Sequence, residues 1–359
     1  MLYKLLLSLA DAASFFNVFR YITFRIILAA LTSMGLWLFF GKAYIERIRR
    51  YNIQQIVRAD GPKHHGKKSG TPTMGGVMIL GAALFSCLLW CDVVSSLVVF
   101  VWAVILLYAL IGFQDDYIKI RRRRNQGLTG RQKLVLQSLV GLGAGAVLYF
   151  SDQFSPTLTV PVFKGLIFNL GPFYIPFAAL VLVASSNSCN LTDGLDGLAV
   201  GPIIMAAGTY MIFAYCAGNV VIARHLQIAS VPGSAELAVV LAALIGACLG
   251  FLWFNTYPAQ IFLGDVGSLS LGAALGLAAL IVKQEILLVL VGGLFVIEAL
   301  SVIIQVVVFK ATKGSRVFRM APLHHHFELL GWEEPKVIVR FWIIAIILSL
   351  AGLSTLKLR

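Results

Sequence analysis

Long apolar segments, separated by short polar ones, limit what this sequence can fold into. A helix that crosses a bilayer needs about 20 mostly apolar residues. Ten segments of roughly this kind occur, at 21–40, 73–90, 96–114, 132–150, 173–186, 198–217, 236–254, 266–282, 286–309 and 337–356. Hydrophobic residues make up 59% of the chain and charged residues 13%, whereas soluble domains average about 45–50% apolar residues. The sequence therefore predicts an all-α polytopic membrane protein with ten transmembrane helices in a single domain, 1–359.

Basic residues are concentrated in three of the intervening loops. Of the 29 Lys and Arg residues, 20 lie in loops 42–68, 119–133 and 310–336. Loops 91–95, 151–172, 218–235 and 283–285 hold only Lys164, Arg224 and Lys283. Because cytoplasmic loops are rich in Lys and Arg, we expect the basic loops, with 187–197 and 255–265, to face the cytoplasm and both termini to lie outside. In a membrane protein, the net charge of +13 then indicates anionic lipids or phosphorylated substrates rather than nucleic acid.

Two features are expected to be structural. Segment 151–172 has Pro156, Pro161, Gly171 and Pro172 among Thr, Val and Phe residues, which favours a short external hairpin. Most of the five cysteines lie in apolar segments without metal-ligand spacing, so we expect them to be small core residues.

The densest polar stretch is 187–197, NSCNLTDGLDG, between two apolar runs. It contains the amides Asn187 and Asn190, the carboxylates Asp193 and Asp196, and Gly194. Unsatisfied polar groups near lipid cost several kcal/mol each. So many at the end of a membrane segment indicate a functional site.

Asp115 and Asp116 end the segment 96–114 and are followed by Lys119. Adjacent carboxylates at a helix C-terminus oppose the helix dipole and each other. Mg²⁺ binds a few carboxylates together with substrate phosphates, so the pair suits it. The alternative is a surface turn with salt bridges to Arg121–Arg124.

Two more cytoplasmic loops carry candidate ligands. In 67–76, Lys68 and a helix N-terminus that Thr73 is able to cap suggest a phosphate site, or simply a capped helix entry. In 254–268, Asp265 offers carboxylate oxygens and Phe262 an aromatic face for a base. An interfacial anchor for Phe262 and a helix cap for Asp265 are the alternatives. Asn255 and Gly264 also lie in this loop, and the glycine permits close backbone approach.

The last polar groups lie on segment 286–309 and in 321–328, APLHHHFE. Glu298 and Gln305 are seven residues apart and share one helix face, where they serve either a cavity or helix–helix contact. Three adjacent histidines diverge, so His324, His325 and His326 are expected to be phosphate donors or a proton shuttle rather than one zinc site.

Carboxylates for Mg²⁺ and cations for phosphates on one membrane face predict phosphoryl transfer at the membrane surface. A secondary transporter, whose intramembrane acids relay protons, is the alternative from another class. It predicts acids near the middle of the bilayer.

Several strings resemble the bacterial phospho-N-acetylmuramoyl-pentapeptide-transferases: TPTMGG (71–76), DDYIK (115–119), NLTDGLDGLA (190–199), FLWFNTYPAQIFLGDVGSL (251–269) and APLHHHFE (321–328). The likeness runs nearly end to end and includes FNVFRYITFR (16–25) and VRFWII (339–344). NLTDGLDG alone is typical of the wider superfamily of polyprenyl-phosphate sugar-1-phosphate transferases. Small departures at 186–189, Gln114 and Leu263 remove no proposed ligand.

The resemblance implies a homodimer of ten-helix chains in the bacterial inner membrane, with a cytoplasmic Mg²⁺ site. The implied reaction moves phospho-MurNAc-pentapeptide from UDP-MurNAc-pentapeptide to undecaprenyl phosphate, giving lipid I and UMP for peptidoglycan synthesis. The nearest alternative is a related enzyme that transfers GlcNAc-1-phosphate.

The resemblance also implies residue roles. Asp265 is the implied Mg²⁺ ligand, with Asp115 and Asp116 beside it and His324 as a further catalytic residue. Asp115 is the candidate base for the lipid phosphate, or attacks first itself. The implied uridine pocket consists of Lys68, Gly194, Leu195, Asp196 and Phe262. The rest of the expected site is lined by Thr73, Lys133, Asn187, Asn190, Asp193, Asn255, Gly264, Gln305, Ala321, His325 and His326.

Overall fold

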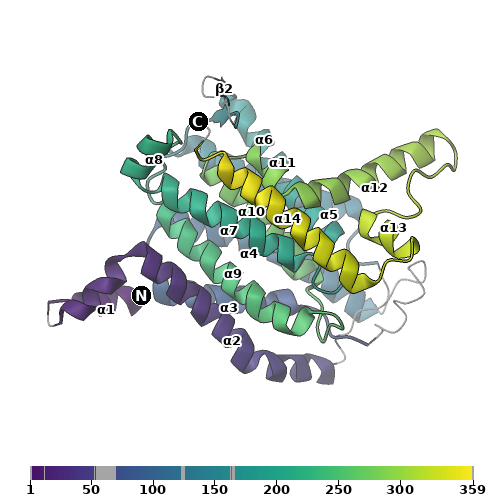
Figure 1. Ribbon diagram of the computed structural model, residues 1–359, viewed down its shortest axis with the longest axis horizontal. Helices are drawn as coiled ribbons and strands as arrows, with labels where there is room; N and C mark the ends of the chain where they lie inside the picture. The colour runs from purple at the N-terminus through teal and green to yellow at the C-terminus, as the bar shows by residue number, and fades with distance from the viewer. Residues whose placement is uncertain are drawn as a thin grey trace.

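The computed structural model describes residues 2–11, 13–51, 53, 70–122, 126–161, 163 and 166–357, and most of them are helical (Figure 1). The long helices are α2 (Ile22–Arg50), α3 (Gly75–Trp90), α4 (Ser96–Arg122), α5 (Gly130–Phe150), α6 (Tyr174–Thr192), α7 (Val200–Ala217), α9 (Ser234–Asn255), α10 (Gly264–Ile281), α12 (Gly293–Ala311) and α14 (Glu334–Ser354). The short elements are α1 (Leu2–Ser8), α8 (Val220–Leu226), α11 (Leu287–Val291), α13 (Leu323–Leu329) and the 3-10 helices η1 (Ser14–Arg20) and η3 (Gly171–Phe173).

The helices have the length and composition of membrane spans. In the described residues, nine are long and apolar enough to cross a bilayer. This confirms an all-α polytopic membrane protein. The remaining apolar helix, α3, has 16 residues and is about 24 Å long, against about 30 Å for the hydrocarbon core. The count of ten spans stays a prediction.

Several predicted boundaries differ from the structure. Helix α2 continues ten residues past the predicted end at 40, to Arg50. Helix α4 continues past Gln114 to Arg122, and α6 continues past Ser186 to Thr192, because polar residues extend a helix when their side chains find partners. The segment 286–309, predicted as one helix, is interrupted at Gly292–Gly293 between α11 and α12. Glycine is a weak helix former, and a Cβ on Gly293 would lie 2.9 Å from Leu348 of α14.

Helix α10 lies at the centre of the bundle and packs against α3, α4, α6 and α7 (Figure 1). Its span is 89% buried, whereas that of α12 is 22% buried. Glycines allow the close approach. A Cβ on Gly112 of α4 would lie 2.3 Å from the backbone oxygen of Asp265, and one on Gly76 of α3 would lie 2.2 Å from the backbone nitrogen of Gly267. Membrane helices commonly pack through such small residues.

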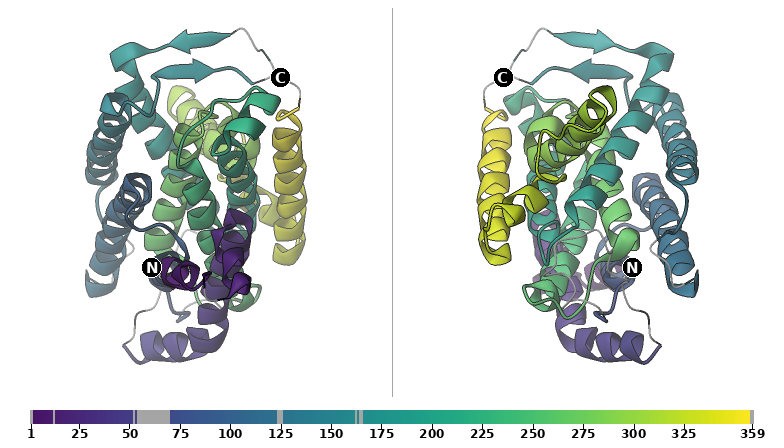
Figure 2. Two further views of the ribbon diagram at one scale, coloured as in Figure 1. Left: turned by 90° about the vertical axis from the view of Figure 1, so that its left-hand side faces the viewer. Right: turned by 90° about the vertical axis from the view of Figure 1, so that its right-hand side faces the viewer.

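The hairpin predicted in 151–172 is present. Strands β1 (Thr157–Thr159) and β2 (Ile167–Asn169) pair antiparallel, with Leu158 opposite Phe168. Figure 2 shows the two strands lying across one end of the helix bundle. The hydroxyl of Thr159 donates to the backbone oxygen of Lys283 at 3.0 Å, which ties the hairpin to the far end of α10.

Both ends of the chain lie at the end of the bundle where α3 and α7 finish. Lys4 of α1 pairs with Asp92, just after α3, at 2.6 Å. Near the C-terminus, Leu356 packs against an apolar cluster that includes Cys216 and Ala217, the last residues of α7. Helices α3 and α7 both begin near the polar loops, so the two ends of the described chain lie at the opposite end of the bundle from those loops. That the termini lie outside the cell stays a prediction.

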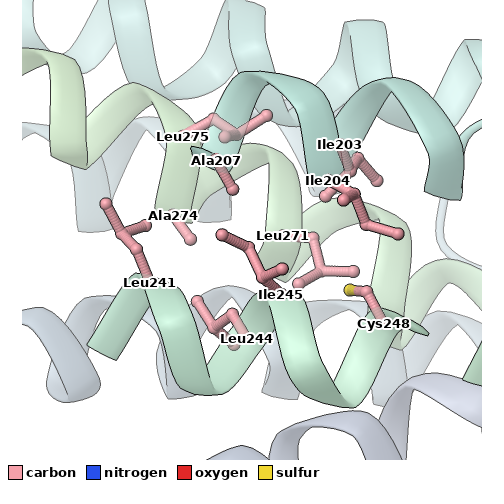
Figure 3. A pocket seen from close by; sticks show the side chains of 10 residues that line it. All are labelled: Ile203, Ile204, Ala207, Leu241, Leu244, Ile245, Cys248, Leu271, Ala274 and Leu275. Atoms are coloured by element: carbon pink, nitrogen blue, oxygen red, sulfur yellow. The ribbon is translucent and has the colours of Figure 1, made fainter. Parts of the chain in front are cut away.

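A cavity between α7, α9 and α10 is lined entirely by apolar side chains (Figure 3). Its volume is about 10 Å³. Without polar partners, such a space does not retain water, and it is far too small for a nucleotide. This cavity is therefore not a site for a polar substrate.

The contact between α4 and α10 predicts the effect of Gly112→Ala. The added methyl group would overlap backbone, which cannot swing away as a side chain can. We expect the substitution to lower the thermal unfolding midpoint in detergent, with a loss of about 1–3 kcal/mol, as overpacking usually causes. Gly143→Ala on α5 is the matched control, since nothing lies within 4 Å of its Cβ position. Equal midpoints for the two variants would contradict the close packing.

The end of the bundle away from the polar loops is held by a buried ion pair. Arg25 Nη2 donates to Glu236 Oε1 at 2.6 Å, and its Nη1 donates to Glu236 Oε2 and to the backbone oxygen of Trp90. We expect Glu236→Gln to lower the free energy of unfolding by about 3 kcal/mol, because it leaves a buried guanidinium without its counter-charge. Lys4→Ala removes a pair whose lysine is 49% exposed and is expected to change stability by less than about 1 kcal/mol. Chemical unfolding of both variants in detergent checks this, and similar losses would contradict it.

Candidate functional site

Three carboxylates meet where α4 ends and α10 begins. Asp115 and Asp116 lie in the last turns of α4, and Asp265 lies in the first turn of α10. One oxygen of each lies within 4.8 Å of the others. Asp265 makes no side-chain helix cap, so the structure does not support that alternative. The predicted grouping of these acids is confirmed, with the pair inside a helix rather than in a loop.

Backbone and amide groups fix each carboxylate. The Leu128 nitrogen donates to Asp115 Oδ1 at 2.8 Å, and the Val266 nitrogen donates to Asp116 Oδ2 at 3.3 Å. Asn190 Nδ2 donates to Asp265 Oδ1 at 3.0 Å and to Ser268 Oγ at 2.8 Å. The predicted residue Asn190 therefore reaches the acids from the end of α6.

Two lysines neutralise much of this negative charge. Lys119 Nζ lies 2.5 Å from Asp115 Oδ2 and 3.1 Å from Asp265 Oδ2. Lys133 Nζ lies 2.6 Å from Asp265 Oδ2 and 3.4 Å from Asp115 Oδ2. Lys133 was predicted as a site residue and Lys119 was not. The signal for Lys119 was its spacing, because residues three and four positions apart share one helix face.

The donor set suits a divalent cation. Three carboxylates and two ammonium groups leave one net negative charge, and the carboxylate oxygens converge from two helices. Hard oxygen ligands of this kind are those that Mg²⁺ prefers. The structure therefore supports a metal site built from Asp115, Asp116 and Asp265.

Residues 194–197, which follow α6, line a second side of the site, called the second wall. Asp196 Oδ2 accepts from the Ala259 nitrogen at 2.9 Å, and the Asp196 nitrogen donates to Glu334 Oε1 at 3.1 Å. Leu195 packs in a small apolar cluster with residues of α14. Positive φ at Gly197, +78°, turns the chain here, a conformation that glycine adopts without strain.

The Asp193 carboxyl is affected by negative charges of both the acid cluster and this wall. Burial first, and then the negative charges of Asp265, Asp116 and Asp196, raise the pKa of this carboxyl from 3.8 to about 8. Like charges that approach closely disfavour ionisation. Asp193 is therefore in the field of both groups of residues.

The three histidines have three different partners, in line with their predicted divergence. His324 faces Glu298, with Nδ1 3.3 Å from Oε2. His325 Nδ1 lies 2.8 Å from Glu328 Oε2. His326 Nδ1 accepts from the Arg319 nitrogen at 3.1 Å. Of the three, His324 touches the second wall, since a Cβ on Gly194 would lie 2.2 Å from its Nε2.

The TPTMGG loop closes the site beside the acids. The Phe262 nitrogen donates to the Pro72 oxygen at 2.8 Å, and the Gly75 nitrogen donates to the Phe262 oxygen at 2.9 Å. A Cβ on Gly264 would lie 3.2 Å from the Thr73 hydroxyl, so Thr73 lies at the site. Its predicted helix cap is wrong: α3 begins after Met74, whose φ is +71°, without a side-chain cap. Lys68 lies outside the described residues.

Several predicted residues bond to the protein itself. Asn187 donates to Gln137 Oε1, Gln305 bonds the backbone of Phe318, and Asn255 donates to the Ile261 oxygen. Ala321 precedes α13 and is partly exposed. Substrate contact by these four residues, and by His326, stays a prediction.

Sequence comparisons place the chain among known proteins. The glycosyl transferase family 4 model matches residues 98–283, and the phospho-N-acetylmuramoyl-pentapeptide-transferase signature 1 matches residues 68–80. Proteins named phospho-N-acetylmuramoyl-pentapeptide-transferase match over 100% of both chains: 55% identity in Desulfatibacillum aliphaticivorans, 53% in Desulfosudis oleivorans and 52% in Geobacter sp. strain M21. With family matches of this extent, the chain belongs to the phospho-N-acetylmuramoyl-pentapeptide-transferase family.

Proposed function

We propose that this protein transfers phospho-MurNAc-pentapeptide from UDP-MurNAc-pentapeptide to undecaprenyl phosphate, giving lipid I and UMP. Membership of the family supports the reaction. The observation that carries it in the structure is the cluster of Asp115, Asp116 and Asp265 with Lys119 and Lys133. Phosphoryl transfer needs alignment and charge neutralisation more than covalent chemistry, and this cluster supplies fixed charges of both signs.

The transporter alternative has less support. Its proton-relaying acids would lie midway along the helices. Asp115 and Asp116 instead lie in the last turns of α4, and Asp265 lies in the first turn of α10. The acids therefore lie at one end of the bundle, where a water-soluble nucleotide and a lipid headgroup are able to meet.

In the proposed reaction, an oxygen of the lipid phosphate attacks the phosphorus that carries the sugar. A new P–O bond forms, the P–O bond to UMP breaks, and UMP leaves with the electron pair. Asp115 accepts the proton of the lipid phosphate. Lys133 and Lys119 stabilise negative charge near Asp265, as fixed cations do at other phosphoryl-transfer sites.

We propose Mg²⁺ as the cofactor, held by Asp265 with Asp115 and Asp116. When bound, it would neutralise diphosphate charge and so stabilise UMP as the leaving group. Asn190 fixes the Asp265 carboxylate, and Lys133 limits repulsion among the acids.

The second wall is the proposed nucleotide side of the site. Gly194, Leu195 and Asp196 would contact uridine with Lys68, and Phe262 would stack on the base. Phe262 is partly exposed and lies two residues before Gly264, which adjoins the Asp116 carboxylate. This suits a nucleotide that reaches the metal through its phosphates. His324 and His325 would lie along the same substrate.

We further propose that this end of the bundle faces the cytoplasm of the bacterial inner membrane and that the chain forms a homodimer. Orientation rests on the concentration of Lys and Arg in loops 42–68, 119–133 and 310–336. The homodimer rests on the family resemblance.

Asp265→Asn tests the metal assignment. It keeps the side-chain size but removes one charge of the cluster, so we expect UMP release from UDP-MurNAc-pentapeptide and undecaprenyl phosphate to fall by at least about 10²-fold, with folding retained. Asp92→Asn, at the far end of the bundle, is the matched control and should keep its activity. UDP-GlcNAc should not replace the substrate. Undiminished turnover by Asp265→Asn would refute the assignment.

Cysteine labelling tests the orientation. All five native cysteines are buried, so their background labelling should be low. Ser315→Cys, in the exposed loop after α12, should react with a membrane-impermeant maleimide only after cells are opened. Gln153→Cys, exposed beside the hairpin, should react in intact cells. The reverse pattern would invert the proposed topology.

A further inference from the structure

Glu298 is an ionisable side chain that the proposed reaction leaves without a role. It lies on α12 and is fully buried. A carboxylate inside a membrane span is costly unless a partner compensates it, and such groups usually mark functional positions. The partner therefore indicates what Glu298 does.

Both oxygens of Glu298 are directed at one residue. The backbone nitrogen of His324 donates to Oε1 at 3.2 Å, and His324 Nδ1 lies 3.3 Å from Oε2. Among the residues that the structure describes, no lysine or arginine pairs with this carboxylate. Glu298 thus contacts both the backbone of His324, at the start of α13, and its ring.

The other ring nitrogen of His324 faces the proposed nucleotide wall. A Cβ on Gly194 would lie 2.2 Å from Nε2, its nearest neighbour. The His324 residue is 1% exposed. Within the described parts of the chain neither ring nitrogen makes a hydrogen bond, but Nδ1 lies beside the Glu298 carboxylate, whereas Nε2 faces Gly194. A buried polar atom without a partner is unfavourable, so Nε2 is placed for a group that arrives with the substrate.

A carboxylate beside one imidazole nitrogen fixes the ring orientation and favours a proton on that nitrogen. When both ring nitrogens carry a proton, Nδ1 faces the carboxylate and Nε2 is a donor as well. We propose that Glu298 is a positioning residue, which holds His324 so that Nε2 donates to a phosphate oxygen of the nucleotide substrate. This inference rests on the proposed function, since it takes an anionic diphosphate as the partner of Nε2.

The residues around Glu298 and His324 support a role in which Glu298 acts through His324. His325, from the same helix, has its ring centroid 4.2 Å from that of His324, and its own Nδ1 is taken by Glu328. Among the described residues, Glu298 from α12 is thus the carboxylate that contacts His324, and Gly194 contacts it from the α6–α7 connection.

The test uses purified full-length protein in detergent and measures UMP release with both substrates. We expect Glu298→Gln to lower kcat by about 10–100-fold, the usual effect of removing a group that orients an active-site histidine. Glu298→Asp, which keeps the charge, should recover part of this loss. Ser301→Ala is the control. This buried serine lies one turn further along α12, and within the described part of the chain its hydroxyl donates to the backbone oxygen of Glu298 alone. Its kcat should stay within about two-fold of wild type.

A double-mutant cycle separates positioning from a general structural role. In a His324→Ala background, Glu298→Gln should add less than about two-fold to the loss, because the group through which it acts is gone. An equal loss in both backgrounds, or wild-type kcat in Glu298→Gln, would overturn the inference. If Glu298→Gln does not fold, Glu298→Asp with and without His324→Ala gives the same comparison.

The two proposals fail in different ways. Wild-type protein that releases no UMP from these substrates would refute the proposed function. Active wild-type protein with a Glu298 effect independent of His324 would refute only the positioning role.

Discussion

Close approach of three carboxylates is the constraint on which the rest of this structure depends. Two like charges about 4 Å apart repel by about 4 kcal/mol at the effective dielectric constant of a protein surface, and here three acids have oxygens within 4.8 Å of one another. Where α4 and α10 pack at this point, Lys119 and Lys133 lie among the acids and offset their repulsion. Since Lys133 belongs to α5, the site requires three helices, and the one remaining negative charge suits a bound cation.

Packing deeper in the bundle sets the positions of these charges. Gly112 lets α4 touch the backbone of Asp265. One turn beyond Lys133, the buried Gln137 donates to Ser186 Oγ and accepts from Asn187 Nδ2. This network locks α5 to α6. Lys133 and Asn190 therefore reach Asp265 together, which gives Asn187 a structural task whatever its contact with substrate.

Much of the architecture was predictable from the sequence, because apolar length alone defines membrane helices. The acids that meet were predictable too, since each interrupts an apolar segment where a polar group has no other reason to lie. The helix ends were less predictable. Asp115 and Asp116 look like the start of a loop, but Lys119 compensates them on the same helix and α4 continues to Arg122. Such compensation depends on tertiary contacts with Asp265 and Lys133.

Other features depend on contacts between segments far apart in the sequence. The pairing of Glu298 with His324 needs α12 to begin at Gly293 and to lie against α13, whereas the apolar pattern 286–309 predicts one continuous helix. Thr73 resembles a helix cap by sequence, but Met74 takes the left-handed conformation. The loop then pairs with Phe262 instead. In both cases a distant segment outweighs the local preference.

The stretch 187–197 shows how these contacts serve function. Helix α6 ends at Thr192, so Asn190 faces the acid cluster from the helix, whereas Gly194 and Asp196 follow the helix and meet His324 and Ala259. The same short stretch therefore sets the spacing between the proposed metal site and the proposed nucleotide wall. Phosphoryl transfer depends on that spacing, because its catalysis is largely alignment of the attacking oxygen with the leaving group.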